Sequence, residues 1–189
     1  MALKPRSITI TKIVSVDPGL NGCAWAVWVD DKLTNCGLAR VKRAKDATLA
    51  QRIRDAVSEL RLDLGLVVDY TVVIEFPQVY RENKRGSKSK ADPNDLLPLA
   101  AIAGGLACLM PSVITYLPCE WKNRLPKAEP GEDYIVDTRV RDRLDWVERS
   151  AYDLGLDSVA VSLQHNISDA VGIGLHHLGR FERKRVYPR

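Results

Sequence analysis

The chain has 189 residues, of which 46% are apolar, so it can bury a complete core and is not an intrinsically disordered segment. Its formal net charge of +4 is too small to indicate a partner by itself. There is no basic start followed by an apolar run, and no apolar stretch reaches about 18 residues, so we expect neither a signal peptide nor a membrane span. We expect one cytoplasmic domain over residues 1–189, with a mobile basic loop at about 80–93 and a basic tail at 180–189.

The first strong pattern is an apolar run that ends in an acid. Ile13 to Val16 leads into Asp17, and Pro18-Gly19 then marks a tight turn before a second apolar run over 22–29. Asp17 is therefore expected at the end of a buried strand, where a carboxylate is costly unless it is paired or binds a cation. Alternatively, Asp17 only opens the turn, as Asp often does before Pro-Gly.

The next segments predict an antiparallel meander followed by a helix and a strand. Asp30-Asp31-Lys32 is expected to form a hairpin turn between the strand at 22–29 and a strand at 33–41. A helical spacing of apolar residues follows over 47–64, with Asp46 as its cap and Gly65 as its stop. A continuous apolar run over 70–75 then indicates a central parallel strand, and it ends in a second acid, Glu75.

The second half of the chain predicts mostly helices. We expect a helix over 95–110, with Pro98 in its first turn, a strand over 113–117 and a short helix over 118–125. One long helix should begin at Asp137 or Thr138. The residues expected inward on it are Val140, Leu144, Val147, Ala151 and Leu154. Asn166 should cap a last helix over 167–179. This order of elements indicates an α/β domain, a mixed sheet with helices on its faces.

The four cysteines have no metal-type spacing, and we expect them to be reduced, small core residues. They are Cys23, Cys36, Cys108 and Cys119.

Three carboxylates can meet at one edge of this sheet. If the strands ending in Asp17 and Glu75 are parallel neighbours, both side chains emerge where ligand sites of open α/β sheets lie. Asp169, near the start of the last helix, is the third candidate, although it can also complete a capping box with Asn166. Three converging carboxylates repel one another without a cation, and hard oxygen ligands favour Mg²⁺ or Mn²⁺.

Taken together, the motifs resemble those of a known family. They are Val16-Asp17-Pro18-Gly19 with Gly22 following, the apolar strand ending in Glu75, and His165-Asn166-x-x-Asp169-Ala170. In this order and spacing, the chain resembles the RuvC family of Holliday-junction resolvases, in the RNase H-like superfamily, from about Ile13 to Gly179. The long basic stretch after Glu75 and the arginine-rich segment 139–149 resemble bacteriophage members. The implied fold is a mixed five-stranded sheet, three antiparallel strands plus two parallel ones, with helices on both faces.

The resemblance implies a metal-dependent endonuclease that resolves four-way DNA junctions by paired symmetric nicks. Two Mg²⁺ or Mn²⁺ ions about 4 Å apart would bracket the scissile phosphate, one activating water and the other stabilising the leaving oxygen. Asp17 would bridge the ions, with Glu75 and Asp169 completing the ligands. The family's fourth ligand is Asp or His, but this chain has Asn166 there. We favour His165 as the ligand or general base and Asn166 as the cap, and keep Asn166 as the alternative ligand.

Basic and aromatic residues near the proposed site are expected to contact DNA, because each phosphate contact releases counterions. Tyr80 can stack on an unpaired base or lie in the core. The expected DNA-binding residues are Tyr80, Lys84, Arg85, Lys88, Lys90, Lys122 and Lys127, the last two by the family resemblance.

Other functions are also compatible with the sequence. The fold can serve a flap- or branch-cleaving DNA nuclease, an RNA-processing nuclease, or an inactive nucleic-acid-binding domain. An actin-like kinase is disfavoured because residues 17–21 lack the threonines of its phosphate loop. Paired cuts favour a homodimer, and the small residues of the 95–110 helix either form that interface or pack on the sheet. They are Ala101, Gly104, Gly105 and Cys108.

Overall fold

The structure is a computed structural model that describes residues 11–42, 46–65, 70–78, 93–125 and 138–181. Its sheet has five strands in the order β3-β2-β1-β4-β5. The strands are β1 (Lys12–Asp17), β2 (Gly22–Val29), β3 (Lys32–Arg40), β4 (Thr71–Glu75) and β5 (Val113–Tyr116). The helices are α1 (Leu49–Leu64), α2 (Pro93–Leu109), α3 (Pro118–Lys122), α4 (Thr138–Arg141), α5 (Trp146–Asp157) and α6 (Gln164–His177), with a 3₁₀ turn at Val161–Leu163.

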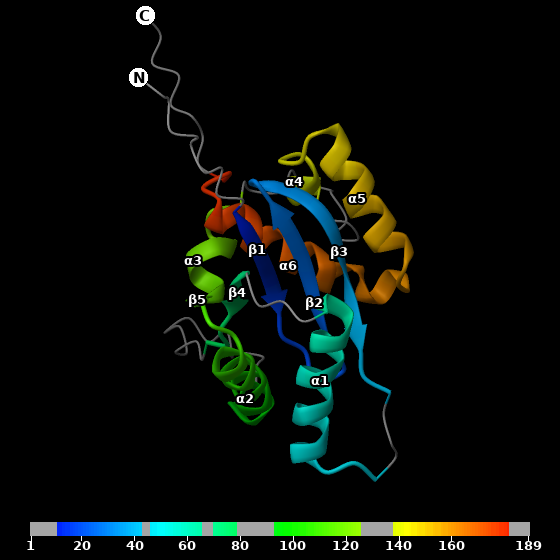
Figure 1. Cartoon of the computed structure of the whole chain (residues 1–189), viewed down its shortest axis with the longest axis vertical. Coiled ribbons are helices and arrows are strands. Elements are labelled where there is room, and N and C mark those ends of the chain that lie inside the picture. Colours follow the sequence, from blue (N-terminus) through cyan, green and yellow to red (C-terminus); the bar gives the residue numbers. More distant parts are fainter. Residues whose placement is uncertain (1–10, 43–45, 66–69, 79–92, 126–137, 182–189) are drawn as a thin grey trace, which may run out of the picture.

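The sheet is mixed, as expected from the sequence. β1 pairs antiparallel with β2, and β2 with β3, whereas β4 runs parallel to both β1 and β5. α1 and α2 cover one face, while α5 and α6 pack on the other (Figure 1). The predicted architecture, with helices on both faces, is therefore confirmed.

The face covered by α6 depends on two glycines that let the helix approach the sheet. A Cβ atom on Gly174 would lie 2.3 Å from Nε1 of Trp28, and one on Gly172 would lie 2.6 Å from the ring of Trp121. Both tryptophans are fully buried. The indole of Trp28 donates a hydrogen bond to the buried hydroxyl of Ser15 on β1, at 3.0 Å. The helix and the two central strands thus pack at a distance that only glycine allows here.

The predicted long helix from residue 137 or 138 is wrong, because the described chain forms two helices, α4 and α5. Asp145 begins α5 as its N-cap and accepts hydrogen bonds from the amides of Val147 and Glu148. The inward face changes with this new start. Val147 and Leu154 are 52% and 72% exposed, while Glu148, Tyr152, Gly155 and Leu156 are buried.

The two other predicted caps are also wrong. Thr48, not Asp46, caps α1, and it forms a capping box with Gln51, whereas Gly65 ends the helix as expected. At the other end of the chain, α6 already begins at Gln164, so Asn166 lies inside the helix. Pro98 lies in the second turn of α2 rather than the first, because α2 begins at Pro93.

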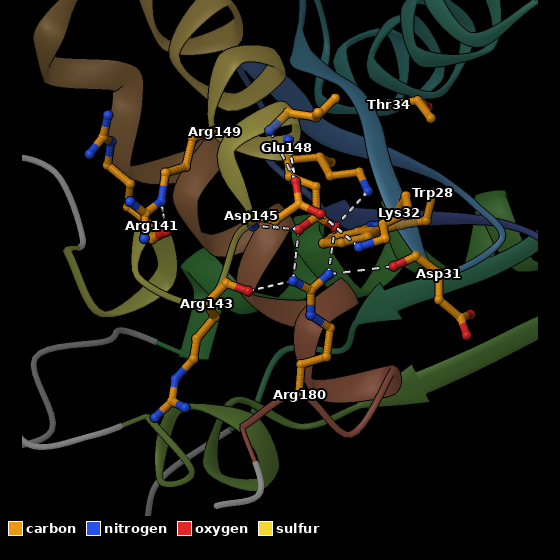
Figure 2. Close-up of polar contacts among 12 residues, drawn as sticks. Trp28, Asp31, Lys32, Thr34, Arg141, Arg143, Asp145, Glu148, Arg149 and Arg180 are labelled. Atoms are coloured by element: carbon orange, nitrogen blue, oxygen red, sulfur yellow. Dashed lines mark hydrogen bonds and ion pairs between the residues drawn. The ribbon is translucent and has the colours of Figure 1, made fainter.

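A buried ion pair joins the end of the described chain to α5 and β3. The carboxylate of Glu148, 1% exposed, accepts two hydrogen bonds from Arg180, at 2.6 and 2.7 Å, and further ones from the amides of Leu33 and Asp145 (Figure 2). Burial alone would raise the pKa of Glu148, but the hydrogen bonds from Arg180 and the two amides lower it. Arg180 and the buried Phe181, the first residues of the expected basic tail, therefore pack on the domain.

The cysteines divide into two kinds. All four thiols are free, and Cys23 and Cys36 are buried as expected. Cys108 is exposed and Cys119 half-buried, so the prediction of a core position is wrong for Cys108.

No helix in the described ranges is both long enough and apolar enough to cross a bilayer.

The close approach of α6 gives a testable prediction. Gly174→Ala should lower the free energy of unfolding by about 1–3 kcal/mol, because the added methyl group overlaps the Trp28 indole. Urea unfolding measures this loss. If the overlap is the cause, the same substitution made together with Trp28→Leu should cost less than it does beside Trp28. Equal costs in both backgrounds would contradict the account.

Candidate active site

Asp17 and Glu75 end neighbouring strands. β1 and β4 are parallel, with Val16 opposite Ile74, so the next residue of each strand lies at the same edge of the sheet. Both side chains are half-buried there. The expectation that these strands are parallel neighbours is confirmed, and it places two carboxylates at the carboxyl edge.

Asp169 brings a third carboxylate to this edge from α6. It is the sixth residue of the helix, in the second turn, rather than in the first turn as expected. The flanking Ser168 and Ala170 are buried, and the Asp169 side chain is 28% exposed. α6 packs against β1 and β2, so its orientation on the sheet decides where this carboxylate lies.

The three acids interact electrostatically. Burial, followed by the charges of Asp169 and Glu75, raises the pKa of Asp17 well above its usual value, and Lys122 offsets this in part. Burial also raises the pKa of Glu75, against the lowering effects of Lys122 and of a hydrogen bond from Trp121. The edge therefore concentrates negative charge that the described residues offset only in part.

The cation of the site is Lys122, from the short helix α3. Its Nζ lies 2.8 Å from Oδ2 of Asp169 and 3.8 Å from Oε2 of Glu75, and 4.9 Å from the centre of the Trp121 ring. Burial would lower the pKa of Lys122, but Asp169 and Glu75 raise it overall, so the amine stays protonated at neutral pH. The sequence indicated Lys122 only as a DNA-facing residue and gave no sign of this pairing.

Trp121 is a second contributor that the sequence did not indicate. Its indole N–H donates a 2.6 Å hydrogen bond to Oε2 of Glu75, while its ring is fully buried against Gly172 of α6. A rigid, buried donor fixes the rotamer of Glu75. The local signal was Pro118 followed by an acid, an aromatic residue and a lysine, but only the fold shows that this segment reaches β4.

These residues fit a hard divalent cation. Within the described ranges, no three His, Cys, Asp or Glu side chains stand close enough together to hold an ion as they are placed. Instead, Lys122 bridges Glu75 and Asp169, while Asp17 keeps a raised pKa caused partly by its acidic neighbours. Carboxylate oxygens are the ligands that Mg²⁺ and Mn²⁺ prefer. A divalent ion would also relieve the repulsion among the three acids.

The candidates for the fourth ligand lie on the first turn of α6. His165 is exposed, while Asn166 is half-buried and lines a pocket beside the acidic edge. The predicted cap role of Asn166 is wrong, because α6 starts at Gln164, three residues before the predicted start, and has no side-chain cap.

Most of the expected DNA-binding residues lie outside the described residues. They are Tyr80, Lys84, Arg85, Lys88, Lys90 and Lys127.

The turn that follows Asp17 is held by backbone and thiol contacts. The carbonyl of Gly19 accepts a hydrogen bond from the amide of Gly22, at 3.2 Å, and a weaker one from the thiol of Cys23, at 3.8 Å. Burial raises the pKa of Cys23 to about 11, and the charge of Asp17 adds to the effect.

The sheet order and the acidic edge define a class of fold, the RNase H-like fold. No protein-family model and no curated protein matches the chain.

Solved structures with similar architecture include RuvC from T. thermophilus in complex with a Holliday junction substrate, with a TM-score of 0.53 and 18% identity over 89% of this chain and 93% of that one. A second Thermus thermophilus RuvC structure has a TM-score of 0.51 and 15% identity, over 90% of this chain and 96% of that one. The yeast mitochondrial Holliday junction resolvase Ydc2 has a TM-score of 0.52 and 9% identity, over 90% of this chain and 82% of that one.

The raised pKa of Asp17 predicts a gain in stability on its removal. The folded state binds a proton at Asp17 more tightly than the unfolded chain, so stability falls as pH rises from the usual value of 3.8 through the raised pKa. At pH 8, without divalent ions, Asp17→Asn should be the more stable form. The gain should be about 1.4 kcal/mol for each tenfold difference between the proton affinities of Asp17 in the folded and unfolded chains. Urea unfolding should show this gain shrinking as the pH approaches 3.8.

The matched control is Asp46→Asn, because Asp46 is exposed and is not among the charges that shift the pKa of Asp17. This variant should change stability by less than about 0.5 kcal/mol. A loss of stability in Asp17→Asn at pH 8 would contradict the electrostatic account.

Proposed function

We propose that the protein is a metal-dependent endonuclease that resolves four-way DNA junctions by paired nicks. The observation that carries the proposal is the meeting of Asp17, Glu75 and Asp169 around Lys122 at the carboxyl edge of the sheet. The similarity in fold to the RuvC and Ydc2 structures, one of them bound to a Holliday junction, supports DNA junctions as the substrate.

The three carboxylates would hold two Mg²⁺ or Mn²⁺ ions. Bound ions would activate the attacking water and stabilise charge on the leaving oxygen. Trp121 keeps Glu75 in one orientation through its hydrogen bond, and Lys122 keeps Asp169 toward Glu75. His165, four residues before Asp169 on the same helix, is the proposed general base or fourth ligand, with Asn166 as the alternative.

DNA affinity in this proposal comes mainly from basic residues away from the acids. The stretch after β4 with Lys84, Arg85, Lys88 and Lys90, together with Lys127, would contact phosphates, and Tyr80 would stack on an unpaired base. From this basic stretch we also infer a bacteriophage-type protein that acts in the host cytoplasm.

We further propose that the protein acts as a homodimer through α2. Ala101 and Cys108 are exposed and Gly104 is half-exposed, so they form one line on the outside of the helix. Leu97 and Leu109 add exposed apolar surface, 66% and 49% exposed. Gly105, by contrast, faces Val57 of α1. Two active sites related by a two-fold axis would make the two symmetric cuts.

The proposal is tested on a synthetic four-way junction with Mg²⁺, Mn²⁺ or EDTA. The wild type should nick symmetrically placed strands only with a divalent ion. Asp17→Asn should lose at least about 100-fold in rate yet bind the junction with nearly unchanged affinity, because affinity depends on basic contacts. Mg²⁺ should also raise the melting temperature of the wild type but not of Asp17→Asn.

The same assay separates the alternatives. Faster cleavage of flap DNA or branched RNA than of the junction would favour another nuclease of this fold. Junction binding with no cleavage under any metal would favour an inactive binding domain. Full activity in Asp17→Asn would exclude the proposed site.

The dimer is tested with Gly104→Glu. A Cβ atom at Gly104 meets no described atom within 4 Å, so the monomer can accept the side chain, and Glu favours a helix more than Gly does. The substitution should leave thermal stability at low concentration intact and convert a dimeric mass to a monomeric one in sedimentation. A monomeric wild type, both free and on junction DNA, would refute the interface.

A further inference from the structure

A pocket of about 610 Å³ opens beside the acidic edge. It lies between the turn after β1, the end of β3 and the start of α6. Its lining residues are Asn21, Gly22, Leu38, Arg40, Val41, Lys42, Leu163 and Asn166.

The turn after β1 and the start of α6, which line the pocket, adjoin residues of the proposed active site in the sequence. Asn21 is four residues after Asp17, in the same turn, and Asn166 is one helical turn before Asp169. Arg40 pairs with Gly22 across the sheet, and the amide of Val41 donates to the carbonyl of Asn21 at 3.3 Å. β3 runs in the same direction as β1, so its end reaches the same edge (Figure 1).

The charge of the pocket is opposite to that of the acidic edge. Arg40 and Lys42 are exposed, and no acidic side chain is among the described residues that line the pocket. Neither cation forms an ion pair with a carboxylate of the described ranges. Arg141 differs, because it pairs with Asp153 at 2.8 Å. Arg40 and Lys42 lie beside carboxylates that repel one another. Their positive charge favours binding of an anionic group that approaches the edge from this side.

The remaining lining residues favour a nucleotide over a bare anion. Asn21 and Asn166 carry carboxamides, which can donate and accept, and Leu38, Val41 and Leu163 supply apolar surface. The volume falls in the range of small-ligand sites, about 300–1,000 Å³. Phosphate contacts position a nucleic acid, while carboxamides read base edges, adenine above all.

We propose that this pocket binds one nucleotide of the strand being cut, next to the scissile phosphate. This inference rests on the proposed nuclease function. Arg40 and Lys42 hold the backbone phosphate of that nucleotide, and the carboxamide of Asn166 contacts its base. The pocket thereby fixes the register of the strand over Asp17, Glu75 and Asp169, and gives cleavage a base preference at one position.

The first test compares Arg40→Ala/Lys42→Ala with Arg61→Ala. Arg61 lines a separate pocket of about 380 Å³ at the end of α1, which precedes β4 and so lies at the opposite edge of the sheet. Binding of a four-way junction is measured by fluorescence anisotropy in EDTA over a range of salt. The double variant should bind at least about tenfold more weakly, with a log–log salt slope smaller by roughly 0.9 for each lost duplex phosphate contact. Arg61→Ala should match the wild type.

The second test locates the contact. A neutral methylphosphonate is placed at successive positions along the cut strand. One position next to the cut should weaken binding of the wild type but cause no further loss in the double variant, because the cations that it would affect are gone. Asn166→Ala should flatten the base preference at that nucleotide while leaving the salt slope unchanged.

The outcomes separate this inference from the proposed function. A wild type that neither binds nor cleaves branched DNA overturns both. A wild type that cleaves, with a folded double variant that keeps the wild-type affinity and slope, overturns the pocket alone. Additive methylphosphonate effects at every position also overturn it. Loss of cleavage on all sequences in Asn166→Ala would assign Asn166 to the metal site and remove its base contact.

Discussion

The distance between α6 and the sheet is the constraint on which the candidate site depends. Gly172 and Gly174 leave room for two tryptophan rings beneath the helix. Trp121, packed in this space, is the residue that hydrogen-bonds Glu75, and the helix above it carries Asp169. The same close packing therefore positions two of the three carboxylates. A larger residue on this face would move the helix and the acid together.

The parts of the fold that the sequence predicted are those set by continuous apolar runs and by the residues that end them. Asp17 and Glu75 close apolar strands, and the parallel arrangement of those strands brings them together whatever the details of the loops. Apart from the core position expected of Cys108, the failed predictions follow from helix starts, where several residues can act as caps. Asn166 is a good cap residue, but α6 begins at Gln164, whose side-chain amide donates a hydrogen bond to the carbonyl of Leu156, at the end of α5.

Other features could not be read from the sequence because they join distant segments. Glu148 and Arg180 are 32 residues apart, and their buried pair also binds the amide of Leu33 on β3. Lys122 reaches Asp169 across 47 residues. In the arginine-rich segment 139–149, which resembled bacteriophage members, Arg141 pairs with Asp153, so part of that basic character serves the domain itself.

The thiol next to the acidic edge bears on which metals the site would select. Cys23 follows the turn after Asp17, and its raised pKa, about 11, keeps it a neutral thiol at physiological pH. Thiolates, not thiols, bind soft metals such as zinc tightly. The thiol of Cys23 therefore adds no negative charge beside Asp17, and the charged donors at this edge are the carboxylates of Asp17, Glu75 and Asp169. The depth at which β2 is buried thus disfavours a charged sulfur next to the acids.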